Sequence, residues 1–195
     1  MPKNRMEAFS DGVLAIIITI MVLELHMPDG ATFDAIRSII PTFIAYVLSY
    51  IYVGIYWNNH HHLVSTLSRV SGKILWFNLH WLFWMSLLPV ATKWLGTYPF
   101  KIAPTFVYGF ILFMCSISYY LLQIEVLKQH KKNSKLKQLF GSDFKGKVSV
   151  ALYLTITICA LFLPILSYVL LVITTLLWII PDRSCLLYTS DAADE

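Results

Sequence analysis

Long apolar runs constrain this chain more than any other feature of its sequence. Four of them, at residues 8–25, 39–57, 74–92 and 102–122, have about the length that a helix needs to cross the hydrocarbon core of a bilayer. Within the first run, Asp11 and Glu24 are the only charged residues. The pattern predicts an all-α integral membrane protein.

A fifth run, at residues 148–180, contains 33 residues and no charge. As a single helix it would be about 50 Å long, which is well beyond the thickness of a bilayer. Pro164 lies near its midpoint, so we expect two short spans, at about 148–163 and 166–180, joined by a tight turn. The total is then six transmembrane helices.

Basic residues are distributed unevenly between the loops on the two sides of these spans. Three of them fall on one side: Arg37, Lys93 and Lys101. Twelve fall on the other: Lys3, Arg5, Arg69, Lys73, Lys128, Lys131, Lys132, Lys135, Lys137, Lys145, Lys147 and Arg183. By the positive-inside rule, both termini are expected in the cytoplasm of a multi-pass protein of the cell membrane. The lysine-rich loop at 128–147 either fixes this topology or also binds anionic lipid head groups.

Composition excludes the main soluble classes. Charged residues make up 13% of the chain, whereas soluble domains carry about 25%. A soluble enzyme or a nucleic-acid partner is therefore not expected, and no nucleophile elbow, phosphate loop or metal motif indicates catalysis or a cofactor. We expect one membrane domain over residues 1–183. The tail at 184–195 (CLLYTSDAADE from Cys185) differs in character and is expected to be non-native or disordered.

The first run presents two different surfaces when it is wound as a helix. At about 100° per residue, Ile16, Thr19, Ile20 and Leu23 share one face, with Arg5 and Phe9 near its cytoplasmic end. Asp11 points about 135° away from that face. The aliphatic stripe alone is compatible with ordinary helix packing or lipid contact. Asp11 is compatible with an N-terminal helix charge or with a buried carboxylate that needs a donor.

The segment 5–25, RMEAFSDGVLAIIITIMVLEL, resembles the first span of the endosomal and lysosomal potassium channel family, transmembrane protein 175, and of its shorter bacterial homologues. Its signature is Arg5, then Phe9, Ser10 and Asp11, then an aliphatic helix. The resemblance continues in YWNNHHHL (56–63), NLHWLFWMSLLPVAT (78–92) and LWIIP (177–181), and it covers about residues 3–183.

This resemblance implies a potassium-conducting, weakly selective cation channel that assembles as a homotetramer, with the first span of each subunit lining the pore. The family uses an aliphatic constriction where other potassium channels use a carbonyl filter. Its filter isoleucine corresponds to Ile16, and the next pore-facing positions fall on Thr19, Ile20 and Leu23. The implied partners are the potassium ion, the lipid bilayer and other copies of the chain.

The resemblance also implies a structural network that ties the first span to its neighbours. It comprises Arg5, Phe9, Ser10 and Asp11, with His60, Asn78 and His80 as candidate partners, and it leaves open which histidine bonds Asp11. We expect no metal at His60, His61 and His62, because consecutive residues on a helix point in different directions. Trp57 is interpreted as an interfacial anchor, and Glu24 either attracts cations to the outer mouth or is merely solvated.

Two other functions remain open from the sequence. A secondary transporter is one, although inverted repeats and broken mid-membrane spans are not evident here. A non-conducting membrane scaffold is the other, because an apolar stripe also suits a helix interface. Ohmic single-channel steps in a planar bilayer would distinguish a channel from both.

Overall fold

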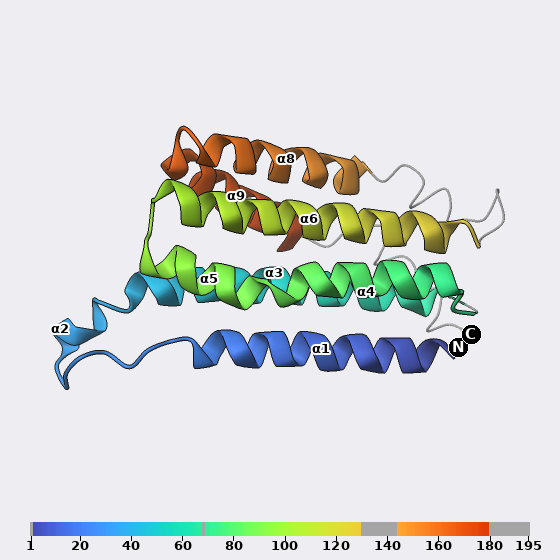
Figure 1. The fold of residues 1–195 in the computed structure, drawn as a ribbon, viewed down its shortest axis with the longest axis horizontal. Coiled ribbons are helices and arrows are strands. Elements are labelled where there is room, and N and C mark those ends of the chain that lie inside the picture. Colours follow the sequence, from blue (N-terminus) through green and yellow to red (C-terminus); the bar gives the residue numbers. More distant parts are fainter. Residues whose placement is uncertain (1, 68, 130–143, 180–195) are drawn as a thin grey trace.

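The computed structural model describes residues 2–67, 69–129 and 144–179, which are helical over most of their length (Figure 1). The elements are α1 (Lys3–Leu23), α2 (Phe33–Ile36), α3 (Ile40–Ser65), α4 (Gly72–Ser86), α5 (Leu88–Thr97), α6 (Ile102–Leu127), α8 (Phe144–Ala160) and α9 (Pro164–Ile179). No strand occurs in these three segments. The predicted tail, Arg183 and most of the lysine-rich loop lie outside the described residues.

Proline and serine residues determine where several helices begin. Pro41, Pro89 and Pro164 lie in the first turns of α3, α5 and α9, where a missing N–H costs no helical hydrogen bond. At the start of α4, the Ser71 side chain accepts a bond of 3.3 Å from the backbone N–H of Ile74. The predicted break at Pro164 is present: α8 ends at Ala160 and α9 begins at Pro164.

Two helices extend further than the apolar runs predict. Because α3 continues to Ser65, His60, His61 and His62 lie on a helix, as expected. Because α1 already begins at Lys3, Asp11 lies about two turns inside the helix, and the first turn contains no acidic residue. The interpretation of Asp11 as an N-terminal helix charge is therefore wrong, since the helix dipole acts mainly within the first turn.

The third apolar run forms two helices in place of one. α4 ends at Ser86, and α5 starts at Leu88 with Pro89 in its first turn. Proline cannot donate a backbone hydrogen bond and its ring crowds the preceding turn, which explains the interruption. Together the two helices make one candidate span from Gly72 to Thr97.

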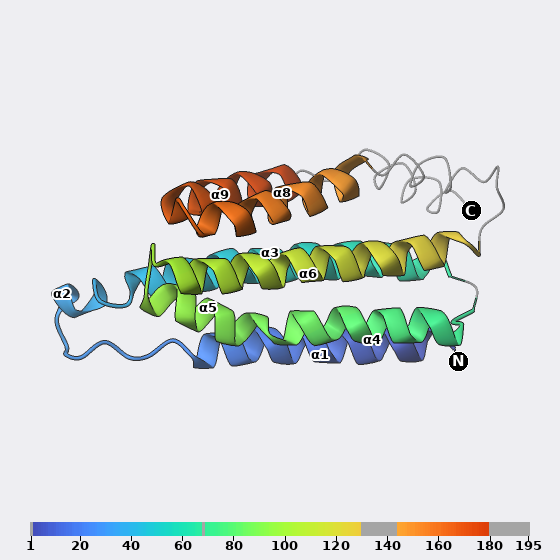
Figure 2. The same cartoon turned by 45° about the horizontal axis from the view of Figure 1, so that its top comes forward.

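Successive long helices run in opposite directions, and together they form three layers. In Figure 2, α8 and α9 form one outer layer, α3 and α6 lie in the middle, and α1 with α4 and α5 forms the opposite layer. The start of α1, the α3–α4 connection and the end of α6 lie at one end of the bundle, while the loop that carries α2 lies at the other (Figure 1). α1 packs on α3, α4 and α5, so one side of α1 faces away from the protomer.

Small residues allow the closest helix contacts. A Cβ atom at Gly96 in α5 would lie 2.5 Å from the Cα atom of Thr42 in α3, which no relaxed structure tolerates. A Cβ at Gly109 in α6 would lie 3.3 Å from side-chain atoms of Ile156 and Thr157 in α8. Close packing through small residues is the usual way in which helices associate in membranes.

The apolar character of the helices fits a membrane protein. By length and hydropathy, four candidate spans occur among the described residues: Lys3–Leu23, Ile40–Ser65, Gly72–Thr97 and Ile102–Leu127. α8 and α9 are also apolar but shorter than 18 residues. The described chain is thus an all-helical bundle with four strongly apolar spans and an apolar helical hairpin.

Candidate functional site

One face of α1 is uncovered and aliphatic. Ile16, Ile20 and Leu23 are 60%, 42% and 74% exposed, and Thr19 is exposed between them. We call these four residues the α1 stripe. Arg5 and Phe9 are exposed on the same helix toward its N-terminal end. The structure therefore brings together the residues that the helical periodicity placed on one face.

The opposite face of α1 is buried in the protomer. Its residues recur at helical spacing and are at most 3% exposed: Met6, Ser10, Leu14, Ile17 and Met21. Leu14, Ile17 and Met21 join the main apolar core, and Met6 joins a second cluster near the N-terminal end of α1. Because this face is anchored in the protomer, the rotation of α1 about its own axis is set, and the α1 stripe must point outward.

A chain of buried hydrogen bonds ties this face to α3 and α4. The side-chain amide of Asn78 in α4 donates to Ser10 Oγ over 2.9 Å, and Ser10 in turn donates to the Met6 carbonyl over 2.9 Å. Asn78 Oδ1 lies 2.8 Å from His60 Nε2 in α3. All three side chains are 0% exposed. Because the side-chain nitrogen of Asn78 donates to Ser10 Oγ, the side-chain oxygen of Asn78 accepts the hydrogen bond from His60. His60 therefore carries its proton on Nε2.

Aromatic packing holds the histidine of this network in place. The His60 ring stacks on the buried Trp81 ring, with centroids 4.8 Å apart and an interplanar angle of 15°. Trp81 also contacts Tyr56 and Tyr119 edge-on or tilted at 6.0 and 5.7 Å. The network therefore lies within a rigid aromatic cluster shared by α3, α4 and α6.

Asp11 is bonded to a tryptophan and not to a histidine. Its Oδ1 accepts a hydrogen bond of 3.0 Å from Trp57 Nε1 in α3. The sequence could not choose among the histidines, and it had interpreted Trp57 only as an interfacial anchor. Asp11 was thus correctly expected to need a donor from a neighbouring helix, but the donor was missed, since nothing in the sequence around Trp57 marks it as one.

The remaining histidines bond elsewhere. His61 Nδ1 lies 2.8 Å from Glu7 Oε1, which links α3 to the N-terminal end of α1. His80 Nε2 accepts a bond of 3.4 Å from Trp84 Nε1, one turn further along α4. His80 therefore does not join the Ser10–Asn78–His60 bonds, contrary to its place in the predicted network. In the described segments, no group of three or more potential metal ligands occurs.

The far end of α1 carries an ion pair that the sequence did not indicate. Glu24 Oε2 is paired with Lys93 Nζ of α5, and both side chains are partly exposed. Glu24 directly follows Leu23 of the α1 stripe. The carboxylate thus has a lysine partner on a neighbouring helix, which neither of the two possibilities that the sequence left open included.

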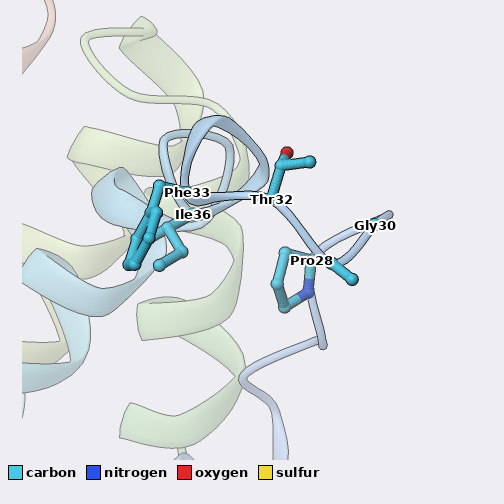
Figure 3. Close-up of a pocket in the computed structure, with 6 residues that line it drawn as sticks. Pro28, Gly30, Thr32, Phe33 and Ile36 are labelled. Carbon is cyan, nitrogen blue, oxygen red and sulfur yellow. The ribbon is translucent and has the colours of Figure 1, made fainter.

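The connection between α1 and α3, which includes α2, contains a shallow hollow (Figure 3). It encloses about 260 Å³ and is lined by Pro28, Gly30, Ala31, Thr32, Phe33 and Ile36. None of these side chains is titratable, and only Thr32 carries a polar side-chain atom. The side chains that line the hollow therefore offer no carboxylate, imidazole or amine for ion binding or catalysis.

Comparisons with known proteins find similar ion channels. A family model described as endosomal/lysosomal potassium channel TMEM175 matches residues 5–89. A potassium channel of Chryseobacterium sp. (strain P1-3) is 49% identical over 183 residues, which are 94% of this chain and 95% of that protein. An endosomal/lysosomal proton channel TMEM175 of Rattus norvegicus is 34% identical over 101 residues, which are 46% of this chain but 20% of the rat protein.

A solved structure has the same fold. The crystal structure of a lysosomal potassium-selective channel TMEM175 homolog from Chamaesiphon minutus superimposes with a TM-score of 0.79 and covers 93% of this chain and 97% of that one. Sequence identity between the two is 24%, so this likeness concerns the fold alone. The arrangement of the helices around α1 is thus one that a solved structure also shows.

Proposed function

Because this chain belongs to the TMEM175 family of endosomal/lysosomal potassium channels, we propose that it is a potassium-conducting, weakly selective cation channel of the cell membrane. The family consists of ion channels, and no feature of the described residues points to catalysis. The choice of potassium follows the Chryseobacterium relative, which matches nearly the whole chain, whereas the rat proton channel matches less than half of it.

The α1 stripe is the observation that carries this proposal. We infer that Ile16 forms the constriction, with Thr19, Ile20 and Leu23 lining the pore beyond it. In a single protomer this face is open, while the buried face of α1 is fixed by the Ser10–Asn78 bond and α1 is further tied by the Trp57–Asp11 bond. A rigidly held helix with an exposed aliphatic face is suited to line a pore whose width must be well defined.

One protomer surrounds no conduit, so several copies must enclose the pore. We propose a homotetramer in which four α1 helices face one another, a copy number that rests on the family resemblance. A ring of aliphatic side chains offers an ion no oxygen ligands, so an ion passes only when the pore is wet enough to leave part of its hydration shell in place. Potassium gives up water more readily than sodium, which gives such a ring a modest preference.

We further propose six membrane spans, with α8 and α9 as the last two, and both termini in the cytoplasm. The positive-inside distribution supports this topology, because the start of α1, the start of α4 and the end of α6 share one end of the bundle (Figure 1). Lys101 and Lys128 flank α6, so single cysteines at these two positions give a matched test in a background without Cys115, Cys159 and Cys185. An impermeant thiol reagent outside intact cells should label Lys101→Cys and spare Lys128→Cys; the reverse pattern refutes the topology.

The channel proposal is tested with purified protein in planar bilayers. The wild-type chain should give ohmic single-channel steps, and Ile16→Asn should pass more current with a potassium-to-sodium permeability ratio closer to one, because four amides replace four aliphatic side chains. Reversal potentials under bi-ionic conditions measure the ratio. Ile18→Val is the control, since Ile18 lies off the α1 stripe. If Ile16→Asn matches the wild type in both quantities, α1 does not line the pore.

Native mass measured in detergent tests the assembly. The chain of 22.4 kDa should migrate as a complex of four copies after the detergent contribution is subtracted. A monomer over a wide range of protein concentration contradicts both the tetramer and the pore that depends on it.

A further inference from the structure

The ion pair between Glu24 and Lys93 lies where α1 ends. Glu24 is the C-cap residue of α1, and its backbone N–H still bonds the Ile20 carbonyl at 3.2 Å. Leu23, the last residue of the α1 stripe, is 74% exposed directly before it. The two charged side chains are 36% and 42% exposed, so their charges are accessible to solvent at the rim of the α1 stripe.

A carboxylate at this position is electrostatically unfavourable by itself. The last carbonyl groups of a helix carry a partial negative charge, and an acidic residue at a C-terminus adds to it. The cation that offsets both comes from another span, 69 positions along the chain. Lys93 thus neutralises a carboxylate that the helix end would otherwise leave as a concentrated negative charge.

The lysine is held in place by the structure around it. The neighbouring Thr92 contacts Met21 Sδ of α1 at 3.9 Å and bonds Ser49 of α3 at 2.7 Å. One turn further along α5, Thr97 donates to the Lys93 carbonyl over 2.8 Å. Thr92 thus ties α5 to Met21 near the end of α1, and Lys93, the next residue of the same helix, pairs with Glu24.

We propose that Lys93 sets the electrostatic potential of the outer pore mouth by cancelling the charge of Glu24, and so limits how strongly the mouth concentrates cations. This inference rests on the proposed pore along α1. In a tetramer the pairs would form a ring of four carboxylates, each matched by an ammonium group. Removing the lysines leaves four unpaired carboxylates that attract cations, and removing the carboxylates leaves four ammonium groups that repel them.

The experiment is a double-mutant cycle read as single-channel conductance against ionic strength. Lys93→Gln should raise inward potassium conductance about two- to fivefold at ~10 mM KCl, where the Debye length is about 30 Å, and by less than ~1.5-fold at ~1 M, where it is about 3 Å. Glu24→Gln should lower the potassium conductance at ~10 mM KCl, and by a smaller factor at ~1 M KCl. The double variant Glu24→Gln/Lys93→Gln should return to the wild-type value at both salt concentrations.

Lys101→Gln is the matched control, because it removes one positive charge at the start of α6, next to the α5–α6 connection, without touching the pair. It should raise the low-salt conductance less than Lys93→Gln does. Equal conductance of Lys93→Gln and wild type at ~10 mM KCl overturns the inference, and so does an equal gain in Lys101→Gln. If Ile16→Asn alters permeation while the Glu24 and Lys93 variants do not, the inference about Lys93 is wrong and the proposed pore is retained. If Ile16→Asn also has no effect, the proposed pore along α1 is wrong, and the inference about Lys93 falls with it.

Discussion

The two faces of α1 carry similar side chains in very different surroundings. Ile16 and Ile17 are neighbours of the same kind, yet Ile16 is 60% exposed and Ile17 is 3% exposed. The buried face is held by core packing and by polar bonds to α3 and α4, whereas Ile16, Ile20 and Leu23 of the α1 stripe are 42–74% exposed. One face therefore determines how α1 is held, and the other is free to meet an ion or a second copy.

The same substitution placed on each face of α1 should give the largest difference in stability between two variants. Ile17→Asn places an amide in the apolar core and loses packed methyl groups, so we expect a loss of about 3–4 kcal/mol in stability and little folded protein. Ile16→Asn should fold and assemble like the wild type. Thermal unfolding in detergent, followed by size-exclusion chromatography, measures both variants. Equal stability of the two variants would mean that the faces do not differ as described.

The buried network should show the next largest effect. Asn78→Leu leaves His60 Nε2 and Ser10 Oγ without their partner, at a cost of about 1–3 kcal/mol. The unfolding temperature should fall, and the fraction that still assembles should keep the wild-type reversal potential. If Asn78→Leu keeps the wild-type stability but changes ion selectivity, Asn78 acts in permeation and not in holding the helices together.

The Asp11–Trp57 bond should contribute less, because it lies at a half-exposed site. Trp57→Phe keeps the aromatic body but removes the N–H that Asp11 accepts, so we expect a loss of about 0.5–1.5 kcal/mol. Asp11→Asn retains an oxygen acceptor and should lose less than Trp57→Phe. The unfolding temperatures of the two variants, compared in one detergent, check this order; the reverse order would indicate that the charge of Asp11 matters more than its bond to Trp57.

The smallest effect is expected for Thr19→Val, a conservative substitution in the α1 stripe. The Thr19 hydroxyl donates to the Ala15 carbonyl of its own helix over 2.8 Å, which leaves only its lone pairs to face the proposed pore. Thr19→Val keeps the shape and removes these acceptors, so conductance should fall by less than about twofold with stability unchanged. Single-channel recording decides: a larger loss than that of any other substitution in the α1 stripe would shift the constriction from Ile16 to Thr19.

Helical periodicity was enough to place the residues of the α1 stripe on one face, because the angle between side chains on a helix follows from their spacing. It placed Ile16, Thr19, Ile20 and Leu23 together, and the structure leaves all four exposed. The break at Pro164 was equally readable, because the constraint that proline imposes is local to its own turn. Helix ends were less accurate, since α3 continues through polar residues that hydropathy counts as loop.

The sequence by itself thus determined the apolar helices, the hairpin at Pro164 and which residues of α1 share a face, because each follows from properties of adjacent residues. Only the tertiary structure decided the partners: Trp57 for Asp11 at a separation of 46 residues, and Asn78 for Ser10 at a separation of 68. It also gave His60, and not His80, to the buried network and paired Lys93 with Glu24. Several polar side chains could have met each of these groups, and only the way the helices pack selects one.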